Sequence, residues 1–335
     1  MDSQASAVLG ASDPNNCSYD KGYVYRQALY CCVTCLKAKK QSEKNNDDIL
    51  HGICLACSYA CHENHELYEL YTKRYFRCDC GNSKFNINGK IQPCKLKSGE
   101  KDAVNTENKY NHNFQGLYCC CNRPYPDHTS ELNASNELNN SSNANDNATL
   151  NNDDSGDMLQ CTVCEDWFHS NHLEGRVNLP LNDDDYEEMI CHSCMSKNGF
   201  LWQYQGYICM KSDGKSKDTS DTNIIDVTGE PSEKINTIEV ENQTCALDML
   251  KDKNKDLKLE KLDQTCFFMK GWRDALCKCE KCLNLYKQND VEFLVKPNDT
   301  IQYYEDCGKL KEAEYQQIDE NKLIDDQLSK LNQVS

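Results

Sequence analysis

Hydrophobic residues in this chain occur in short, scattered groups. An apolar group at Phe200–Tyr204 predicts a segment that packs against the cysteine-rich domain before it. The segment Asp290–Val295 predicts a short strand, and Ile324, Leu328 and Leu331 follow the i, i+4, i+7 spacing of an amphipathic helix. No apolar run approaches the ~20 residues that span a bilayer. We therefore expect a soluble protein with no membrane partner.

Polar stretches divide the chain into parts. Residues 1–16 lack a pattern and predict a flexible tail. Residues 131–153 are rich in Asn, Ser and Asp and predict a disordered loop, and residues 211–263 predict a linker. The segments expected to fold are 17–98, 115–196 and 264–335.

The composition points to metal-stabilised folding. Only 38% of the 335 residues are hydrophobic, too few for one large core, but 24 are cysteines, and 17 of these lie between residues 17 and 194. A structural zinc ion contributes on the order of 10 kcal/mol to folding. Disulfides are the alternative, but the first residues show no signal-peptide pattern and several histidines fall at ligand spacing. We expect small zinc-stabilised α+β modules in the reducing nucleus and/or cytoplasm.

Eight metal-ligand side chains form four consecutive pairs in the middle of the chain. They are Cys119 and Cys121, Cys161 and Cys164, His169 and His172, and Cys191 and Cys194. Zinc takes four Cys or His ligands in a tetrahedron. In an interleaved arrangement, the first and third pairs hold one ion and the second and fourth pairs hold another.

This stretch resembles a PHD finger, a zinc module with this cross-braced ligand order. A Trp-Phe-His segment starts three residues after Cys164, and a C-x-x-C pair closes the stretch. His172 stands where most PHD fingers carry Cys, but neutral imidazole also binds zinc. The resemblance implies that Tyr118, Met158 and Trp167 occupy the positions of an aromatic cage for methylated lysine. Alternatively, Trp167 packs the core of the finger.

An earlier cysteine-rich stretch contains Cys61-His62-Glu-Asn-His65 and Cys78-Asp-Cys80-Gly-Asn82. It resembles a UBR box, the module that binds protein N-termini in the N-degron pathway. The resemblance implies three zinc sites. One takes Cys32, Cys35, His62 and His65, the second takes Cys17, Cys54, Cys57 and Cys78, and the third shares Cys57 and adds Cys80 and Cys94.

The third of these sites lacks one ligand. The family places a His three residues after the last Cys, where this chain has Lys97. Cys61, His112 or a water molecule could fill the position.

The UBR box binds positively charged N-termini through acidic groups. The resemblance matches Asp79 to one of these groups and Asp48 to another. However, Asn82 replaces a second essential Asp, and Arg77 brings a positive charge that repels such ligands. The box is therefore either an active reader of basic N-termini or a UBR-type scaffold.

A further group of cysteines follows the linker. It consists of Cys266, Cys277, Cys279 and Cys282. These residues form a candidate extra zinc site in a small C-terminal α/β segment. The chain is thus expected to bind about five zinc ions, or six if this site is real.

The order of UBR box, PHD-like finger and Cys-containing C-terminal segment resembles one family, the UBR-box proteins with a PHD finger, which are classed as E3 ubiquitin ligases. The match is carried by Arg26-Gln-Ala-Leu-Tyr30, Cys54-Leu-Ala-Cys57-Ser-Tyr59, Glu69-Leu-Tyr71-Thr-Lys-Arg74, Arg77-Cys-Asp-Cys-Gly-Asn82 and Arg123-Pro-Tyr125-Pro. The resemblance implies a ubiquitin-conjugating enzyme as partner.

Other features bear on the function. No Ser-His-Asp constellation or phosphate-binding loop is evident, which suits a ligase that works by proximity. The net charge of −17 disfavours direct binding to nucleic acid and favours a basic partner such as a histone tail. The alternative function is a histone-tail reader without enzymatic activity.

Overall fold

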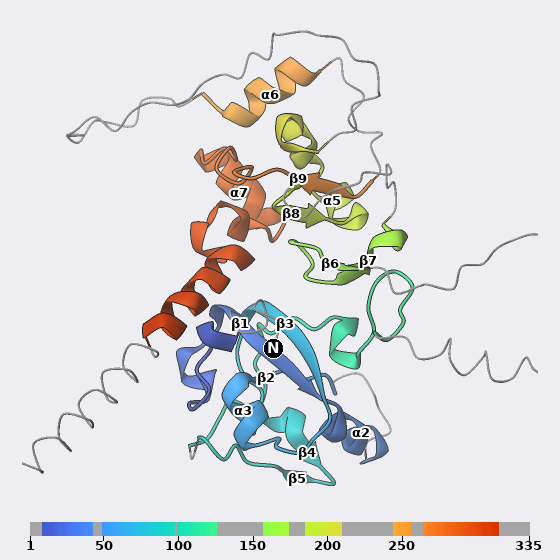
Figure 1. The fold of residues 1–335 in the computed structure, drawn as a ribbon, viewed down its shortest axis with the longest axis vertical. Helices are drawn as coiled ribbons and strands as arrows, with labels where there is room; N and C mark the ends of the chain where they lie inside the picture. The colour runs from blue at the N-terminus through green and yellow to red at the C-terminus, as the bar shows by residue number, and fades with distance from the viewer. Residues whose placement is uncertain are drawn as a thin grey trace, which may run out of the picture. The chain divides into compact units, whose positions relative to one another are not determined.

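The computed structural model describes residues 9–42, 49–97, 99–125, 157–173, 185–209, 244–255 and 264–314 (Figure 1). The chain divides into two compact units. The first comprises Met1–Gln160, Glu165–His172 and Lys296–Ser335, and the second comprises Cys161–Cys164 and Leu173–Val295. Among the described residues, none of the helices has the length and apolar character needed to cross a bilayer.

A three-stranded antiparallel sheet of order β2-β1-β3 lies in the first unit. Its buried side chains Leu29, Leu70 and Phe76 pack with Phe114 in one apolar cluster. The elements of this unit are η1 (Ser18–Lys21), β1 (Val24–Cys32), α2 (Val33–Ser42), β2 (Ile53–Cys54), α3 (Leu55–Ala60), β3 (Leu67–Phe76), η2 (Ser83–Phe85), β4 (Asn86–Ile87), β5 (Lys90–Ile91), η3 (His112–Gln115), β6 (Met158–Gln160), β7 (Trp167–His169), η5 (Ser170–His172) and η10 (Pro297–Asp299).

A β-bulge interrupts the pairing of β1 and β3. The register shifts between Ala28 and Tyr30, and Tyr71 on the opposite strand has a φ of 58°. This left-handed conformation costs a side-chain-bearing residue about 1–2 kcal/mol. The Tyr71 ring packs edge-on against Trp167 of β7, with centroids 5.5 Å apart. The bulge therefore turns the Tyr71 side chain toward β7, a strand of the PHD-like stretch.

The start of the chain packs onto the first sheet. Residues 9–11 are helical, and Ala11 packs in an apolar cluster with Ala28 and Tyr304. The hydroxyl oxygens of Ser12 and Tyr304 lie 2.7 Å apart, and the Ala28 N–H donates to the Tyr304 hydroxyl at 3.1 Å. The prediction of a flexible tail is therefore wrong for residues 9–12. Residues 1–8 lie outside the described residues, as do the predicted loop 131–153 and the helix predicted from Ile324, Leu328 and Leu331.

The second unit is built around the antiparallel pair β8 and β9. Leu201, Phe268, Trp272 and Tyr286 are fully buried. The burial of Leu201 with Phe200, Trp202 and Tyr204 confirms the packing predicted for this apolar group. The elements of this unit are β8 (Glu188–Ile190), α5 (His192–Lys197), η7 (Gly199–Tyr207), α6 (Ala246–Asn254), β9 (Cys266–Phe268), α7 (Glu280–Gln288) and η9 (Glu292–Val295).

Two sequence predictions fail in the second unit. The predicted linker contains α6, whose Leu247 is buried and whose Asn254 side chain donates to the Gln203 carbonyl at 3.0 Å. The strand predicted at Asp290–Val295 is the short helix η9. Phe293 and its neighbour Leu294 are both buried, whereas strand geometry places adjacent side chains on opposite faces.

Candidate metal centres

The first cluster lies where β1 meets α2. Its ligand atoms, from Cys32, Cys35, His62 and His65, all lie within 4.8 Å of one another. Cys32 Sγ is 3.2 Å from His65 Nδ1, and Cys35 Sγ is 3.6 Å from His62 Nδ1. Because Cys32 ends β1 and Cys35 lies in the first turn of α2, the strand-to-helix junction sets their separation. The Cys35 N–H donates to Cys32 Sγ at 3.4 Å, which favours the thiolate.

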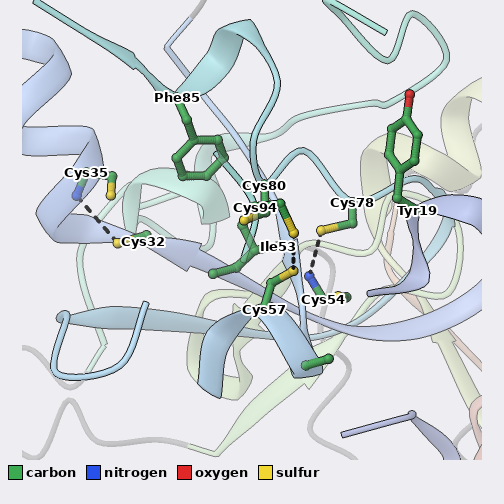
Figure 2. Packing of buried hydrophobic residues seen from close by; sticks show 11 residues of the cluster. Tyr19, Cys32, Cys35, Ile53, Cys54, Cys57, Cys78, Cys80, Phe85 and Cys94 are labelled. Carbon is green, nitrogen blue, oxygen red and sulfur yellow. Dashed lines mark hydrogen bonds between the residues drawn. The ribbon is translucent and has the colours of Figure 1, made fainter. Parts of the chain in front are cut away.

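Two further clusters share Cys57, as Figure 2 shows for most of the side chains. One contains Cys17, Cys54, Cys57 and Cys78, and the other contains Cys57, Cys61, Cys80 and Cys94. Helix α3 organises both. Cys54 is its N-cap, Cys57 lies in its first turn and Cys61 is its C-cap. Residues four apart lie on one helix face, so Cys57 and Cys61 converge on Cys94 at 3.7 and 3.9 Å.

The structure places Cys61 in the ligand position that the sequence left open. His112 does not reach this cluster. Its Nδ1 lies 2.8 Å from Asn122 Oδ1, and its Nε2 lies 2.8 Å from Asp166 Oδ2. Lys97, at the position where the family carries a His, forms an ion pair with Asp20 at 2.8 Å.

Gly81 allows the last cysteines of these clusters to meet. Its φ is +86°, a conformation that strains any residue with a side chain. A Cβ at this position would lie only 2.7 Å from the backbone nitrogen of Cys94. The glycine after Cys80 therefore permits both the turn and the approach of the Cys94 segment.

Lys101 is a functional residue that the ligand spacing did not reveal. With one Zn²⁺ in each cluster, the seven thiolates carry −7 and the ions +4, which leaves −3 at the joined clusters. Lys101 Nζ lies 3.4 Å from Cys17 Sγ and also donates to the Cys80 carbonyl. Its positive charge offsets part of this excess. Two other lysines, Lys95 and Lys97, also follow Cys94, so no sequence signal singled out Lys101.

Asp79 is not placed to bind a ligand. Its side chain is fully buried. Its carboxylate accepts from Gly52 N at 2.9 Å and from Tyr110 Oη at 2.8 Å. It also accepts from the side-chain amides of Asn82, Asn105 and Asn108. Burial raises the pKa of Asp79 to about 6, and the donors around it oppose this rise because they stabilise the carboxylate form.

The expectation that Asp79 holds an incoming amine is therefore wrong for this conformation, because the carboxylate oxygens already accept hydrogen bonds from groups of the protein itself. Asn82 is one of its donors, and Arg77 stacks on the Tyr19 ring at 3.8 Å and pairs with Asp102. Asp48, the other expected acidic group, lies outside the described residues.

The later finger contains two clusters with the ligand order predicted for a cross-brace. One is Cys119, Cys121, His169 and His172, and the other is Cys161, Cys164, Cys191 and Cys194. In the first, Cys119 Sγ is 3.6 Å from His172 Nδ1 and Cys121 Sγ is 3.5 Å from His169 Nδ1. In the second, the sulfurs of Cys164 and Cys191 are 3.9 Å apart.

The expected cage residues lie on or near the β6–β7 pair. Met158 pairs with His169 and Gln160 pairs with Trp167, so Met158 and Trp167 lie on one face. Trp167 also packs against Tyr71 of β3, as described above, which is a contact with the first sheet and not with the core of the finger; the cage and the core-packing alternative both stay predictions. Tyr118 is half-buried, and burial raises its pKa to about 12.

The C-terminal cysteines differ from the predicted set in one member. Cys266 lies in β9, where it is buried with its sulfur 4.0 Å from the Gln264 carbonyl, and burial raises its pKa to about 12. It is not a member of this group. Instead, Cys245 Sγ lies 3.9 Å from Cys277 Sγ and 3.5 Å from Cys282 Sγ. No nearby Cys or His marks Cys245 in the sequence, and the polar composition of residues 211–263 placed it in the predicted linker.

None of the cysteines is joined to another by a disulfide. A disulfide joins sulfurs at about 2.05 Å, whereas sulfurs around a tetrahedral zinc lie about 3.8 Å apart, given Zn–S bonds of about 2.3 Å. The separations of 3.7 and 3.9 Å around Cys94 match the second value. Four protein donors in each cluster mark closed, structural sites.

The fold and clusters define a zinc-finger protein that combines a UBR box with a PHD finger. Residues 16–97 match the family model "Putative zinc finger in N-recognin (UBR box)", and residues 142–205 match "UBR7-like PHD finger". Along its full length the chain is 35% identical to "Putative E3 ubiquitin-protein ligase UBR7" of Homo sapiens and of Mus musculus, covering 80% of each relative. The chain belongs to the UBR7 family.

A fungal relative is similar over a shorter region. "Protein mlo2" of Schizosaccharomyces pombe is 33% identical over 200 residues, which cover 59% of this chain and 49% of the relative. No solved structure matches this chain.

Proposed function

We propose that this protein is an E3 ubiquitin-protein ligase. The observation that carries the proposal is the similarity along the whole chain to relatives named as such ligases. The metal clusters agree with it, because each has four protein donors and leaves no position for a substrate. The zinc ions are structural, and transfer relies on holding a loaded ubiquitin-conjugating enzyme next to a substrate lysine.

The described clusters bind five zinc ions in this proposal. Three lie in the UBR box and two in the PHD finger, with Cys57 as a bridging ligand. The pairwise separations of 3.2 to 3.9 Å among their donors support this assignment. A closed zinc site fixes the loops around it, so the role of these ions is to shape the surfaces that hold the two partners.

Two adjacent cysteines allow a matched test of the mechanism. Cys121 belongs to a cluster, whereas Cys120 is exposed. Purified protein is mixed with activating enzyme, a panel of conjugating enzymes, ubiquitin and nucleosomes. We expect ubiquitin transfer by wild type and by Cys120→Ala, and loss of transfer with loss of one zinc ion in Cys121→Ala. Absence of transfer by wild type in every combination would refute the ligase assignment, and loss in Cys120→Ala would show a covalent thioester route.

We further propose a basic protein substrate, with a histone tail in the nucleus as the first candidate. The net charge of −17 and the shared face of Met158 and Trp167 support it. Trp167→Ala is expected to weaken binding of methylated histone peptides while the zinc content stays unchanged. Binding without ubiquitin transfer would favour the alternative of a reader that has no enzymatic activity. Binding by the variant equal to wild type would exclude Trp167 from the peptide site.

A further inference from the structure

Three C-x-x-C pairs in this chain begin a helix in the same way. In each, the first cysteine is the N-cap with an extended backbone and the second lies in the first helical turn. The φ and ψ angles are −74° and 167° at Cys54, −66° and 157° at Cys191, and −67° and 158° at Cys279. The first two pairs belong to four-donor clusters of the zinc fingers. The third pair, Cys279 and Cys282, has the same backbone geometry at the start of α7.

Two more sulfurs converge on this third pair. Cys277 comes from the segment just before α7, and Cys245 comes from the N-cap of α6. The sulfur of Cys245 lies 3.9 Å from that of Cys277 and 3.5 Å from that of Cys282. These separations exclude a disulfide, at about 2.05 Å, and fit ligands of one tetrahedral zinc, at about 3.8 Å.

We propose that Cys245, Cys277, Cys279 and Cys282 bind a sixth zinc ion. This ion lies outside the two zinc fingers that the family models describe, which end at residue 205. Four thiolates are the ligand set that soft metals such as zinc prefer, and four protein donors make the site structural.

The surroundings of Cys277 hold it in place for this role. Its backbone N–H donates to the Tyr204 hydroxyl at 3.1 Å, and its carbonyl accepts from the Tyr286 hydroxyl at 3.0 Å. Tyr204 and Tyr286 are both buried, so their positions are fixed by packing. Such support around a ligand is typical of built metal sites.

The ion would attach α6 to the rest of the second unit. Helix α6 has 9 residues, which is too short for stability on its own. Leu247 is the residue of α6 that is buried. The ion pair between Asp248 and Lys281 of α7 is exposed and adds little. A zinc bond to Cys245 would add to the burial of Leu247 and to the hydrogen bond from Asn254 to the Gln203 carbonyl, and so hold this short helix against the rest of the unit.

The test measures the zinc content of the full chain, purified under reducing conditions, by native mass spectrometry and elemental analysis. We expect six zinc ions in wild type, five in Cys245→Ala and six in Cys266→Ala, a matched control because Cys266 is the neighbouring cysteine outside the cluster. The proposal would be overturned by five zinc ions in wild type or by iron at this site. It would also be overturned if Cys266→Ala had five zinc ions and Cys245→Ala had six.

A second measurement covers the case in which Cys245→Ala does not fold. Wild-type protein is treated with a thiol-alkylating reagent, and the modified sites are mapped by mass spectrometry. Cys245 and Cys279 are only partly buried, so burial alone would not protect them. We expect rapid modification of the exposed Cys120 and modification of these two residues only after a chelator is added. Modification of Cys245 at the rate of Cys120 without chelator would refute the site.

Discussion

At the scale of single residues, Asp79 shows how a side chain typical of a binding motif can serve the fold. Its carboxylate is buried and accepts hydrogen bonds from Gly52, Tyr110 and the nearby Asn side chains. Each hydrogen bond to a charged group contributes about 1.5–3 kcal/mol. The carboxylate therefore stabilises the UBR box and is not available to an N-terminal amine.

The first prediction concerns N-degron recognition. Because Asp79 is occupied and Arg77 is positively charged nearby, we expect no preference for a peptide with a free N-terminal Arg over the same peptide N-acetylated. Fluorescence anisotropy with both peptides measures this difference. A clear preference for the free Arg peptide, lost at high salt, would show that the box still reads basic N-termini.

The second prediction concerns Lys101. Replacing it by Met removes the positive charge next to the clusters that share Cys57, so zinc affinity should fall by about 10- to 100-fold. Competition with a chromophoric chelator measures the change. Lys97→Met is the control, since Lys97 pairs with Asp20 on the surface. Equal zinc affinity in the Lys101 variant and in wild type would exclude charge compensation by this residue.

At the scale of elements, a buried ion network joins segments distant in sequence within the first unit. Asp299 of η10 is fully buried and accepts two bonds from Arg74 of β3, each 3.0 Å long. Arg26 of β1 lies 3.5 Å from the same carboxylate, and Glu165 lies 3.4 Å from each arginine. The network fixes the chain after residue 295 to the sheet that carries the first metal cluster.

The third prediction tests this network. Asp299→Asn leaves two buried guanidinium groups with one fewer carboxylate, which costs about 3–5 kcal/mol. Thermal unfolding followed by circular dichroism should show a Tm lower by roughly 10 °C. The matched change Asp306→Asn affects an exposed pair with Lys309 and should alter stability by at most about 0.5 kcal/mol. Similar Tm values for the two variants would contradict a stabilising network.

At the scale of the whole molecule, metal ligands take the place of a large apolar core. The cluster in Figure 2 contains Cys32, Cys35, Cys54, Cys57, Cys78, Cys80 and Cys94 but few purely apolar residues, among them Ile53 and Phe85. Folding costs conformational entropy, and so few buried apolar residues cannot compensate for it. Zinc binding, at about 10 kcal/mol per ion, can supply the missing free energy.

The fourth prediction follows from this composition. Removing zinc from the reduced chain with excess chelator at neutral pH should abolish the cooperative thermal transition, and adding zinc back should restore it. Near-ultraviolet circular dichroism reports the loss, because buried rings such as Phe85 and Trp272 leave their packed sites. A reduced, zinc-free chain that keeps the signal would show that packing alone holds the fold.

The sequence alone determined the ligand pairs, because a tetrahedral ion requires soft donors at short, regular spacing in tight turns. Local spacing was enough for the pairs at Cys119, Cys161 and Cys191, whereas the resemblance to a UBR box supplied the pair at Cys32. Resemblance to known families predicted the UBR and PHD modules and, together with the composition, the confirmed zinc-stabilised α+β fold class, and the apolar run at Phe200 predicted a packed segment.

Only the tertiary structure decided the residues whose partners are distant in sequence. Cys61, and not His112, lies at the open ligand position of the third cluster, because α3 places Cys61 one turn after Cys57. The tertiary structure also replaced Cys266 with Cys245, since β-pairing commits Cys266 to a buried strand. The sequence predicted Asp79 as a ligand-binding group, whereas in the structure it has a structural role because residues 105–110 enclose it. Spacing reports local geometry, whereas burial and long-range approach depend on how the whole chain packs.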